Sequence, residues 1–156
     1  MAATDELPAS SEKIGTKTRD IMEVPPTILL QTATIDDAAN VMWEKNMGSI
    51  IAVDDEGRMV GILTERDILF AVSKSLIGRG VPLSSIMSKT SLKASPNEGI
   101  VTAVDRMTKG RVRHLPVVDK DGKPVGMISM RDAMSISEPL LKYVLKSTHR
   151  KKRAKS

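Results

Sequence analysis

One short phrase occurs twice in this chain and limits what it can fold into. Val60–Asp67 reads VGILTERD, and Val125–Asp132 reads VGMISMRD 65 residues later. Between positions 35 and 69, ten residues are identical to their counterparts 65 places on, whereas chance would give about two at average residue usage. The chain therefore contains an internal duplication. Two repeats cannot form a solenoid, so we expect a closed pair with pseudo-twofold symmetry.

The first half of the first repeat predicts a strand and a helix. A short apolar run at residues 27–30 has the length and flanks of a strand. Apolar residues then recur at helical spacing from Ile35 to Met42, behind Thr34 as a possible N-cap. The Asn-Met-Gly sequence at 46–48 predicts the end of this helix.

The second half of the repeat predicts a hairpin and another helix. Residues 50–53 and 59–63 are apolar, and the turn sequence between them, 54–57, ends in a glycine that can adopt positive φ. Thr64 caps a helix that reaches about Ser73. The second repeat reproduces the helix stripe, the strand and the turn. This order of elements predicts an α/β (α+β) fold.

The domain boundaries follow from composition. Residues 1–15 contain too few apolar residues to repay the entropy of ordering, and they predict a flexible arm. The repeats span 16–74 and 81–138. Residues 139–156 predict a short amphipathic helix and a basic tail.

The positive charge of the chain is confined to that tail. Seven of its residues from Leu140 onward are Lys or Arg and none is acidic, so removing them from the net charge of +5 leaves −2. The tail is compatible with a solvated charge run or with phosphate contacts to nucleic acid. The candidate contacts are Arg150, Lys151, Lys152 and Arg153.

Several functional classes are disfavoured by what the sequence lacks. There is no cysteine, which excludes disulfides and thiolate chemistry. No run of about 18 apolar residues and no signal peptide are present, so we expect a cytoplasmic protein without membrane association. Its two histidines lie apart from acidic clusters, and no catalytic triad or phosphate loop can be assembled. We expect neither a metal site nor an enzyme.

The repeated phrase ends in a pair of residues with two compatible interpretations. The spacing of Thr64 and Asp67 is that of a helix cap. A helix N-terminus also favours phosphate, and a carboxylate there can accept hydrogen bonds from both ribose hydroxyls. Ser129 and Asp132 repeat the arrangement.

Two further residue types in the phrase leave alternatives open. Arg66 and Arg131 lie in a first helical turn, where arginine is unfavourable unless an anion or a carboxylate is near; solvated side chains are the alternative. Both are ligand-binding candidates. Gly61 and Gly126 lie inside strands and indicate either a close approach by another backbone or a ligand, or tight packing between the repeats.

The motif Gly-x-x-Thr/Ser-x-x-Asp, present twice behind matched hairpins and helices, resembles that of tandem cystathionine-β-synthase (CBS) domains, also called a Bateman module. The resemblance covers about residues 16–137. It implies two βαββα units packed sheet to sheet, adenosine nucleotides in clefts between them, and homodimers of pairs that form a flat disc. Most stand-alone members of this family are regulators rather than catalysts.

The resemblance also implies two crossed clefts, in which the ribose aspartate of one repeat works with residues that precede strands of the other. The first cleft would contain Ile62, Thr64 and Asp67 with Met87, Leu92, Val112 and Arg113. The second would contain Met127, Ser129 and Asp132 with Met22, Thr27, Met47 and Gly48.

The two clefts differ in charge at matched positions. Arg113 and His114 match positions that often hold phosphate in the family, whereas Gly48 and Ser49 do not. We therefore expect AMP, ADP or ATP in the first cleft. The methionine-lined second cleft suits a less charged adenosine such as S-adenosylmethionine, although methionine lining is also typical of plain core packing.

These features give a leading hypothesis and a rival. The leading hypothesis is a regulatory binding module that senses an adenosine nucleotide and transmits binding to a partner, as an independent sensor or as the detached regulatory subunit of an enzyme or transporter. The rival is a nucleic-acid-associated accessory protein, in which the pair is a dimerisation scaffold and the tail contacts the polyanion.

Overall fold

The computed structural model describes residues 15–89 and 92–136, together with Lys142 and Lys146. They form two compact units. The first-repeat unit comprises Val24–Ser91 and Val118–Val125; the second-repeat unit comprises the chain up to Glu23, Leu92–Val117 and the chain from Gly126. The residues just before each repeat's first strand therefore pack with the other repeat.

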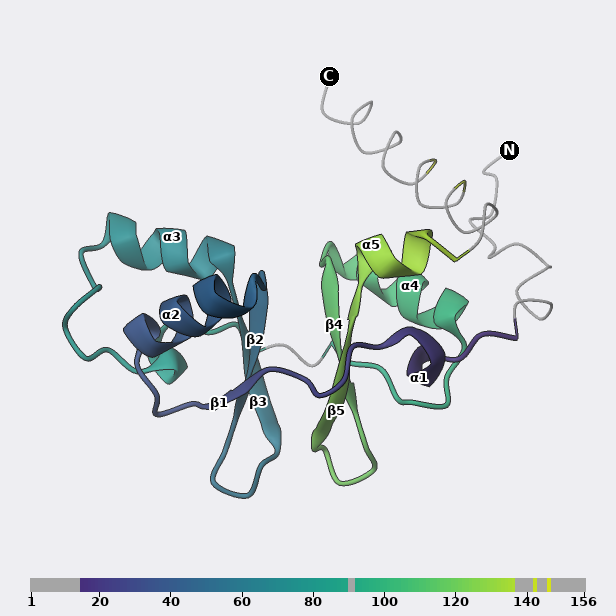
Figure 1. Ribbon diagram of the computed structural model, residues 1–156, viewed down its shortest axis with the longest axis horizontal. Helices are drawn as coiled ribbons and strands as arrows, with labels where there is room; N and C mark the ends of the chain where they lie inside the picture. The colour runs from purple at the N-terminus through teal and green to yellow at the C-terminus, as the bar shows by residue number, and fades with distance from the viewer. Residues whose placement is uncertain (1–14, 90–91, 137–141, 143–145, 147–156) are drawn as a thin grey trace. The chain divides into compact units, whose positions relative to one another are not determined.

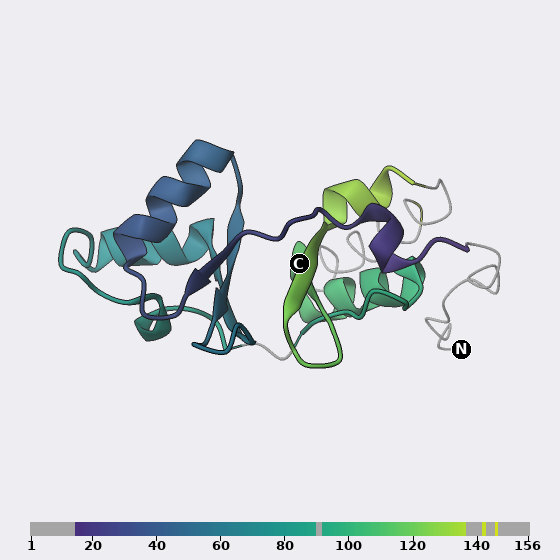
Figure 2. The same cartoon turned by 60° about the horizontal axis from the view of Figure 1, so that its bottom comes forward.

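The first-repeat unit is a three-stranded sheet with two helices on one face. Its elements are β1 (Ile28–Leu30), α2 (Ile35–Lys45), β2 (Ser49–Val53), β3 (Met59–Thr64), α3 (Glu65–Ser73) and the 3₁₀ turn η2 (Leu83–Ser85). β2 lies in the centre, parallel to β1 and antiparallel to β3. Figure 1 and Figure 2 both show α2 and α3 on the same side of this sheet.

Alternation along the strands places the core of this unit between sheet and helices. Ile50 and Leu63 are fully buried and pack with Ala38 and Met42 of α2. Side chains alternate between the two faces of a strand, so the neighbours of Ile50 and Leu63 point to the opposite face. That opposite face carries Ile62.

The predicted ends of α2 are confirmed. The Thr34 hydroxyl accepts a hydrogen bond from the Asp37 N–H at 3.1 Å, and the Asp37 carboxylate accepts one from the Thr34 N–H at 3.1 Å. Hydrogen bonds from the Thr34 backbone and then from its side chain hold the pKa of Asp37 below its ordinary value. Asn46 ends the helix in a left-handed conformation with φ 51°.

The predicted hairpin turns are also confirmed. Asp54 Oδ1 accepts hydrogen bonds from the N–H groups of Glu56 and Arg58, both at 2.9 Å. Asp119 makes the corresponding contacts 65 residues later. The backbone hydrogen bond from Arg58 is the main reason why the pKa of Asp54 is lowered. Gly57 has a φ of +80°, a conformation that side chains with a Cβ rarely adopt.

The second-repeat unit repeats this plan with one strand fewer. Its elements are α1 (Thr18–Ile21), α4 (Ile100–Gly110), α5 (Met130–Met134) and most of β4 (His114–Val118) and β5 (Pro124–Ser129). The turn end of that hairpin, Val118–Val125, falls in the first-repeat unit. The predicted apolar stripe of α4 is buried, as Ile100, Val104 and Met107 have no exposed surface. The counterpart of β1 is a single parallel bridge between Ala94 and Val117. Residues 93–95 lack the apolar run of β1, which accounts for the shorter pairing.

The strand glycines are explained by close approaches within each unit. A Cβ on Gly61 would lie 2.8 Å from Met87 Sδ and 2.9 Å from the Ser88 carbonyl oxygen. Ser88 cannot easily retreat, because its N–H and C=O both pair with Ile62 at 3.0 Å. A Cβ on Gly126 would meet the side chain of Met22 at 2.6 Å. Of the alternatives, the close approach of another backbone explains the glycine at position 61, and the packing of a side chain explains the glycine at position 126.

We expect Gly61→Ala to lower the free energy of unfolding by about 1–3 kcal/mol, the usual cost of overpacking a close contact. Urea denaturation measures this value. Gly15→Ala is the control, since nothing lies within 4 Å of that position. An unchanged unfolding midpoint for Gly61→Ala would show that residues 87 and 88 move aside without cost.

Candidate ligand-binding site

Three strand ends meet at one edge of the first-repeat unit. The Thr27 carbonyl accepts a hydrogen bond from the Ile51 N–H at 3.0 Å, so the start of β1 lies beside the start of β2. Ser49 pairs directly with Thr64 at the end of β3. We call Thr27, Met47, Gly48, Ser49 and Thr64 the first sheet end.

The predicted capping pair of α3 forms. The Thr64 N–H donates to Asp67 Oδ2 at 2.8 Å, and the Thr64 hydroxyl donates to the same oxygen at 3.2 Å. The capping box that the spacing predicts is present, and the Thr64 hydroxyl additionally donates to the carboxylate. Within the described chain no hydrogen bond engages Asp67 Oδ1. The half-buried carboxylate is therefore held by one oxygen and can accept from a ligand with the other.

The second-repeat unit shows the cap in its predicted form. The Ser129 hydroxyl accepts a hydrogen bond from the Asp132 N–H at 3.1 Å. The Met130 N–H donates to the Arg113 carbonyl at 2.7 Å, just as the Glu65 N–H donates to the Gly48 carbonyl at 3.1 Å. Arg113 thus occupies the backbone position that Gly48 occupies in the first repeat. Its side chain is exposed.

The predicted methionines lie close to the motifs. Thr27 Oγ1 donates to Met47 Sδ at 2.8 Å, and Thr27 is only 7% exposed. Met22 covers Gly126, while Met127 pairs through its backbone with Glu23. These contacts agree with the core-packing interpretation of the methionines and place them beside the strand ends that carry the candidate site.

The predicted site residues are divided between the two units in a way that differs from their division between the two predicted clefts. The first-repeat unit contains Thr27, Met47, Gly48, Ile62, Thr64, Arg66, Asp67 and Met87. The second-repeat unit contains Met22, Leu92, Val112, Arg113, His114, Met127, Ser129, Arg131 and Asp132. Each predicted cleft combines residues of both units, so the crossed arrangement stays a prediction.

Some predicted contacts acquire no partner or fall outside the described chain. Arg66 and Arg131 are exposed, and neither forms an ion pair with a described residue, which agrees with solvated side chains. The predicted C-terminal helix is described only at Lys142 and Lys146. The four basic tail candidates, residues 150–153, lie outside the described residues.

Ser49 is absent from the predicted site residues but has an unusual environment. It is 1% exposed, and its hydroxyl is a buried polar atom without a hydrogen-bond partner in the described chain. One sequence signal points to it: Ser49 lies 65 residues before His114, which is a predicted phosphate contact.

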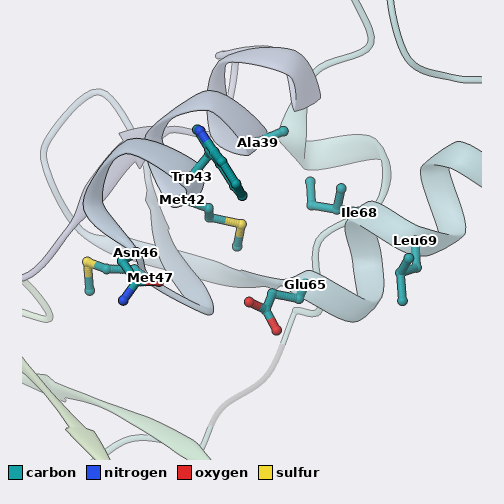
Figure 3. Close-up of a pocket in the computed structure, with 8 residues that line it drawn as sticks. All are labelled: Ala39, Met42, Trp43, Asn46, Met47, Glu65, Ile68 and Leu69. Carbon is teal, nitrogen blue, oxygen red and sulfur yellow. The ribbon is translucent and has the colours of Figure 1, made fainter.

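A second surface feature lies on the helical side of the first-repeat unit. A groove of about 430 Å³ separates α2 from α3, and in Figure 3 Met42 and Trp43 lie across it from Ile68. Its lining residues are Ala39, Met42, Trp43, Asn46, Met47, Glu65, Ile68 and Leu69. Trp43 is 87% exposed and Leu69 is 69% exposed. We call this groove and its rim the α2–α3 surface.

The described residues were also compared with the requirements of a membrane span and of a metal site, and they meet neither. None of the helices in residues 15–89 and 92–136 is long and apolar enough to cross a membrane. In the same part of the chain no group of three or more acidic or histidine side chains is placed to hold a metal ion.

Comparison with known proteins identifies the class to which this arrangement belongs. The model of the CBS domain matches residues 19–74 and 83–138. The chain belongs to the CBS domain family and contains two copies of the domain. The two matches cover both copies of the repeated motif.

Solved CBS pairs have the same fold. A CBS domain protein from Pyrobaculum aerophilum, PAE2072, was determined in complex with AMP; it is 26% identical, with a TM-score of 0.73 over 84% of this chain and 99% of that one. The CBS domain pair of protein MJ0100 was determined with 5′-methylthioadenosine and S-adenosyl-L-methionine. It is 26% identical, with a TM-score of 0.70 over 78% of this chain and 94% of that one.

Curated relatives differ in length. An uncharacterized 17.7 kDa protein from Acidianus ambivalens is 34% identical over 119 residues, which are 76% of this chain and 71% of that protein. A homoserine O-acetyltransferase from Methanohalobium evestigatum is 34% identical over 119 residues, but the match spans 76% of this chain and 24% of the enzyme. Several other matched enzymes are covered to a similarly small extent.

We expect Ser129→Ala to lower the free energy of unfolding by about 1 kcal/mol, because the Asp132 N–H loses its capping acceptor. Thermal or urea denaturation measures the change. Ser129→Thr is the matched control, since it keeps a hydroxyl and should lose only a small part of this stability. Equal losses in the two variants would contradict a capping role.

Proposed function

We propose that this protein is a regulatory module that binds adenosine nucleotides, with the Asp67 and Asp132 carboxylates as the ribose acceptors. The observation that carries the proposal is the state of Asp67, whose Oδ2 is fixed by Thr64 while Oδ1 has no partner within the described chain. A carboxylate oriented in this way can accept from ribose hydroxyls without reorganising. The complexes of PAE2072 with AMP and of the MJ0100 pair with two adenosyl compounds support the ligand class.

The remaining contacts are proposed from the family's crossed arrangement. Arg113 supplies positive charge and His114 a ring N–H donor for phosphate, which favours AMP, ADP or ATP in the cleft that contains Asp67. Aliphatic side chains such as Ile62 cover the adenine, whereas Met87 packs with Leu63 in the core on the helical face of the sheet. None of these roles requires catalysis, and we propose that the protein acts by binding alone.

Ligand binding would regulate through a population shift. A nucleotide that binds one arrangement of the pair more tightly than another stabilises that arrangement by mass action. The favoured arrangement would then change how the protein meets a partner, either as an independent sensor or as a separate regulatory subunit.

We expect Asp67→Ala to weaken the tightest-binding nucleotide by about 10- to 100-fold, because hydrogen bonds to a charged group contribute about 1.5–3 kcal/mol. Calorimetry with AMP, ADP, ATP and S-adenosylmethionine measures this loss. Asp55→Ala, an exposed turn position, is the control and should bind as the wild type does. The proposal fails if no compound gives heat or a melting shift, and the assignment of Asp67 fails if Asp67→Ala keeps full affinity.

We further propose that the protein forms a homodimer through the α2–α3 surface. Trp43 and Leu69 present large exposed apolar side chains beside a groove, and such patches on a single chain indicate an interface. Their counterparts 65 residues later are Thr108 and Met134, which are both half-buried, so the second repeat does not reproduce this exposed pair. A twofold contact would place the same surface of each copy against the other.

Trp43→Ala should weaken self-association at least tenfold. Truncating a tryptophan at the centre of an interface often lowers the binding free energy by about 2 kcal/mol or more. Sedimentation equilibrium of the full chain measures it. Glu44→Ala is the control, because Glu44 adjoins Trp43 but does not line the groove. A wild-type monomer at high concentration, or a Trp43→Ala dimer of unchanged strength, would contradict the proposed interface.

A further inference from the structure

The segment before α4 is held in place by little strand pairing. Residues 92–99 are the counterparts of 27–34, which include the paired strand β1. In the second repeat Ala94 forms a single bridge with Val117, and its N–H donates to the Pro116 carbonyl at 2.8 Å. One bridge fixes a segment less firmly than a ladder of three residues, so other contacts are needed. We call residues 92–99 the α4 entry segment.

Arg106 of α4 supplies such contacts near both ends of the α4 entry segment. Its Nη1 donates to the Lys93 carbonyl and to Glu98 Oε1, both at 2.6 Å, and its Nη2 donates to Glu98 Oε2 at 3.3 Å. The Arg106 and Glu98 side chains are 32% and 20% exposed, so salt and water screen their attraction less than that of a surface pair. One guanidinium therefore holds the segment against α4 at two points.

The fold itself does not require this ion pair. The residues 65 positions before Lys93, Glu98 and Arg106 are Ile28, Ala33 and Val41, so the first repeat carries no charge at these positions. Ala33 and Val41 pack against the core of the first-repeat unit instead. A partly buried ion pair is seldom more stable than well-packed apolar residues, because both charges lose hydration. Charge at these positions therefore indicates a role beyond stability.

The α4 entry segment begins with a predicted ligand residue. Leu92 belongs to the predicted cleft that contains Asp67, and it directly precedes Lys93, whose carbonyl Arg106 holds. Its side chain lies against the end of α4, where a Cβ on Gly110 would be 2.5 Å from Leu92 Cδ1. Arg106 therefore positions Leu92 through the backbone, and it need not touch a ligand to do so.

The other end of the segment supports the chain that leads into the first repeat. The Thr18 N–H donates to the Glu98 carbonyl and the Arg19 N–H donates to the Pro96 carbonyl, both at 3.0 Å. The Thr18 side chain is fully buried. We call residues 16–19 the N-terminal stretch. A displacement of the α4 entry segment would loosen this stretch as well, because its backbone donors would lose their acceptors.

We propose that Arg106 is a positioning residue that links nucleotide binding to the N-terminal stretch. The inference rests on the proposed function, because it assumes that a nucleotide contacts Leu92. Since Arg106 keeps the α4 entry segment in one place, the nucleotide meets Leu92 already positioned and binds more tightly. Linkage is reciprocal, so a bound nucleotide steadies the segment and, through it, the amide groups of Thr18 and Arg19.

Calorimetry with AMP on the full chain tests the role in binding. Arg106→Met keeps the apolar stem of the side chain but removes the donors, and it should weaken AMP about fivefold or more, because fewer chains hold the segment in the binding-competent position. Arg106→Lys retains the cation without the fork, and it should recover part of this loss. Lys109→Met is the matched control. It removes an exposed ion pair with Asp105 on the same helix and should change the affinity by less than about twofold.

Hydrogen exchange separates positioning from a general loss of stability. In ligand-free Arg106→Met the amide hydrogens of Thr18 and Arg19 should exchange faster than in the wild type. The amide of Ile51, in the sheet of the first-repeat unit, should not change. Saturating AMP should slow the exchange of Thr18 and Arg19 in the wild type but not in Arg106→Met. Glu98→Gln keeps the size of its side chain and should give the same pattern in weaker form.

The outcomes separate this inference from the proposed function. If the wild type binds no adenosine compound, the proposed function fails and the role of Arg106 in binding fails with it. If the wild type binds AMP and Arg106→Met binds it equally tightly, only the positioning role is overturned. Equal acceleration of exchange at Thr18 and Ile51 would show that the ion pair merely stabilises the fold, and would overturn the inference. Unchanged exchange at Thr18 in the AMP-bound wild type would overturn the link to the N-terminal stretch.

Discussion

The antiparallel ladder between β2 and β3 is the constraint on which the candidate site depends. Its pairing of Ser49 with Thr64 brings the start of one strand to the end of the next, and the hydrogen bond from Glu65 to Gly48 begins α3 at that point. Because the helix begins where the ladder ends, Asp67 lies in its first turn and reaches back to the Thr64 backbone. The loop before β2, the cap of α3 and the carboxylate proposed to bind ribose are thus positioned by one set of backbone contacts.

Because the sequence is duplicated, this arrangement of strand ends and helix cap occurs twice, and the two copies differ in the side chains that they present. The backbone contact of Gly48 with Glu65 recurs as that of Arg113 with Met130. A symmetric backbone therefore presents an arginine in one repeat and a glycine in the other. Since charge at these positions is independent of the fold, the two repeats differ in charge there without any change in architecture.

The first-repeat unit uses the two faces of its sheet for different purposes. One face packs on α2 and α3, whose outer side carries the exposed Trp43 and the groove beside it. The other face carries Ile62 and Thr64 with the buried Ser49. Under the proposed function, a ligand that changes the packing on one face would bias the helices on the other, because closely packed side chains transmit small displacements.

Local sequence patterns determined most of the secondary structure. The stripe from Ile35 to Met42 predicted α2, and the Asp54 to Gly57 turn predicted the hairpin, since helical spacing and turn chemistry act over a few residues. The Thr64 to Asp67 spacing likewise identified the cap, although only the structure showed that the hydroxyl donates. That detail depends on which acceptor is closer in three dimensions.

Other features required the tertiary structure. Gly61 is needed because Ser88, 27 positions away along the chain, brings its carbonyl against the strand. Ser49 reads as an ordinary polar residue before an apolar strand, and its burial without a partner arises only when the ladder and its surroundings close over it. By itself the sequence determined the repeats, their elements and the motif, because these depend on neighbouring residues. Only the tertiary structure decided which distant groups meet, because contacts between remote segments depend on how the whole chain packs.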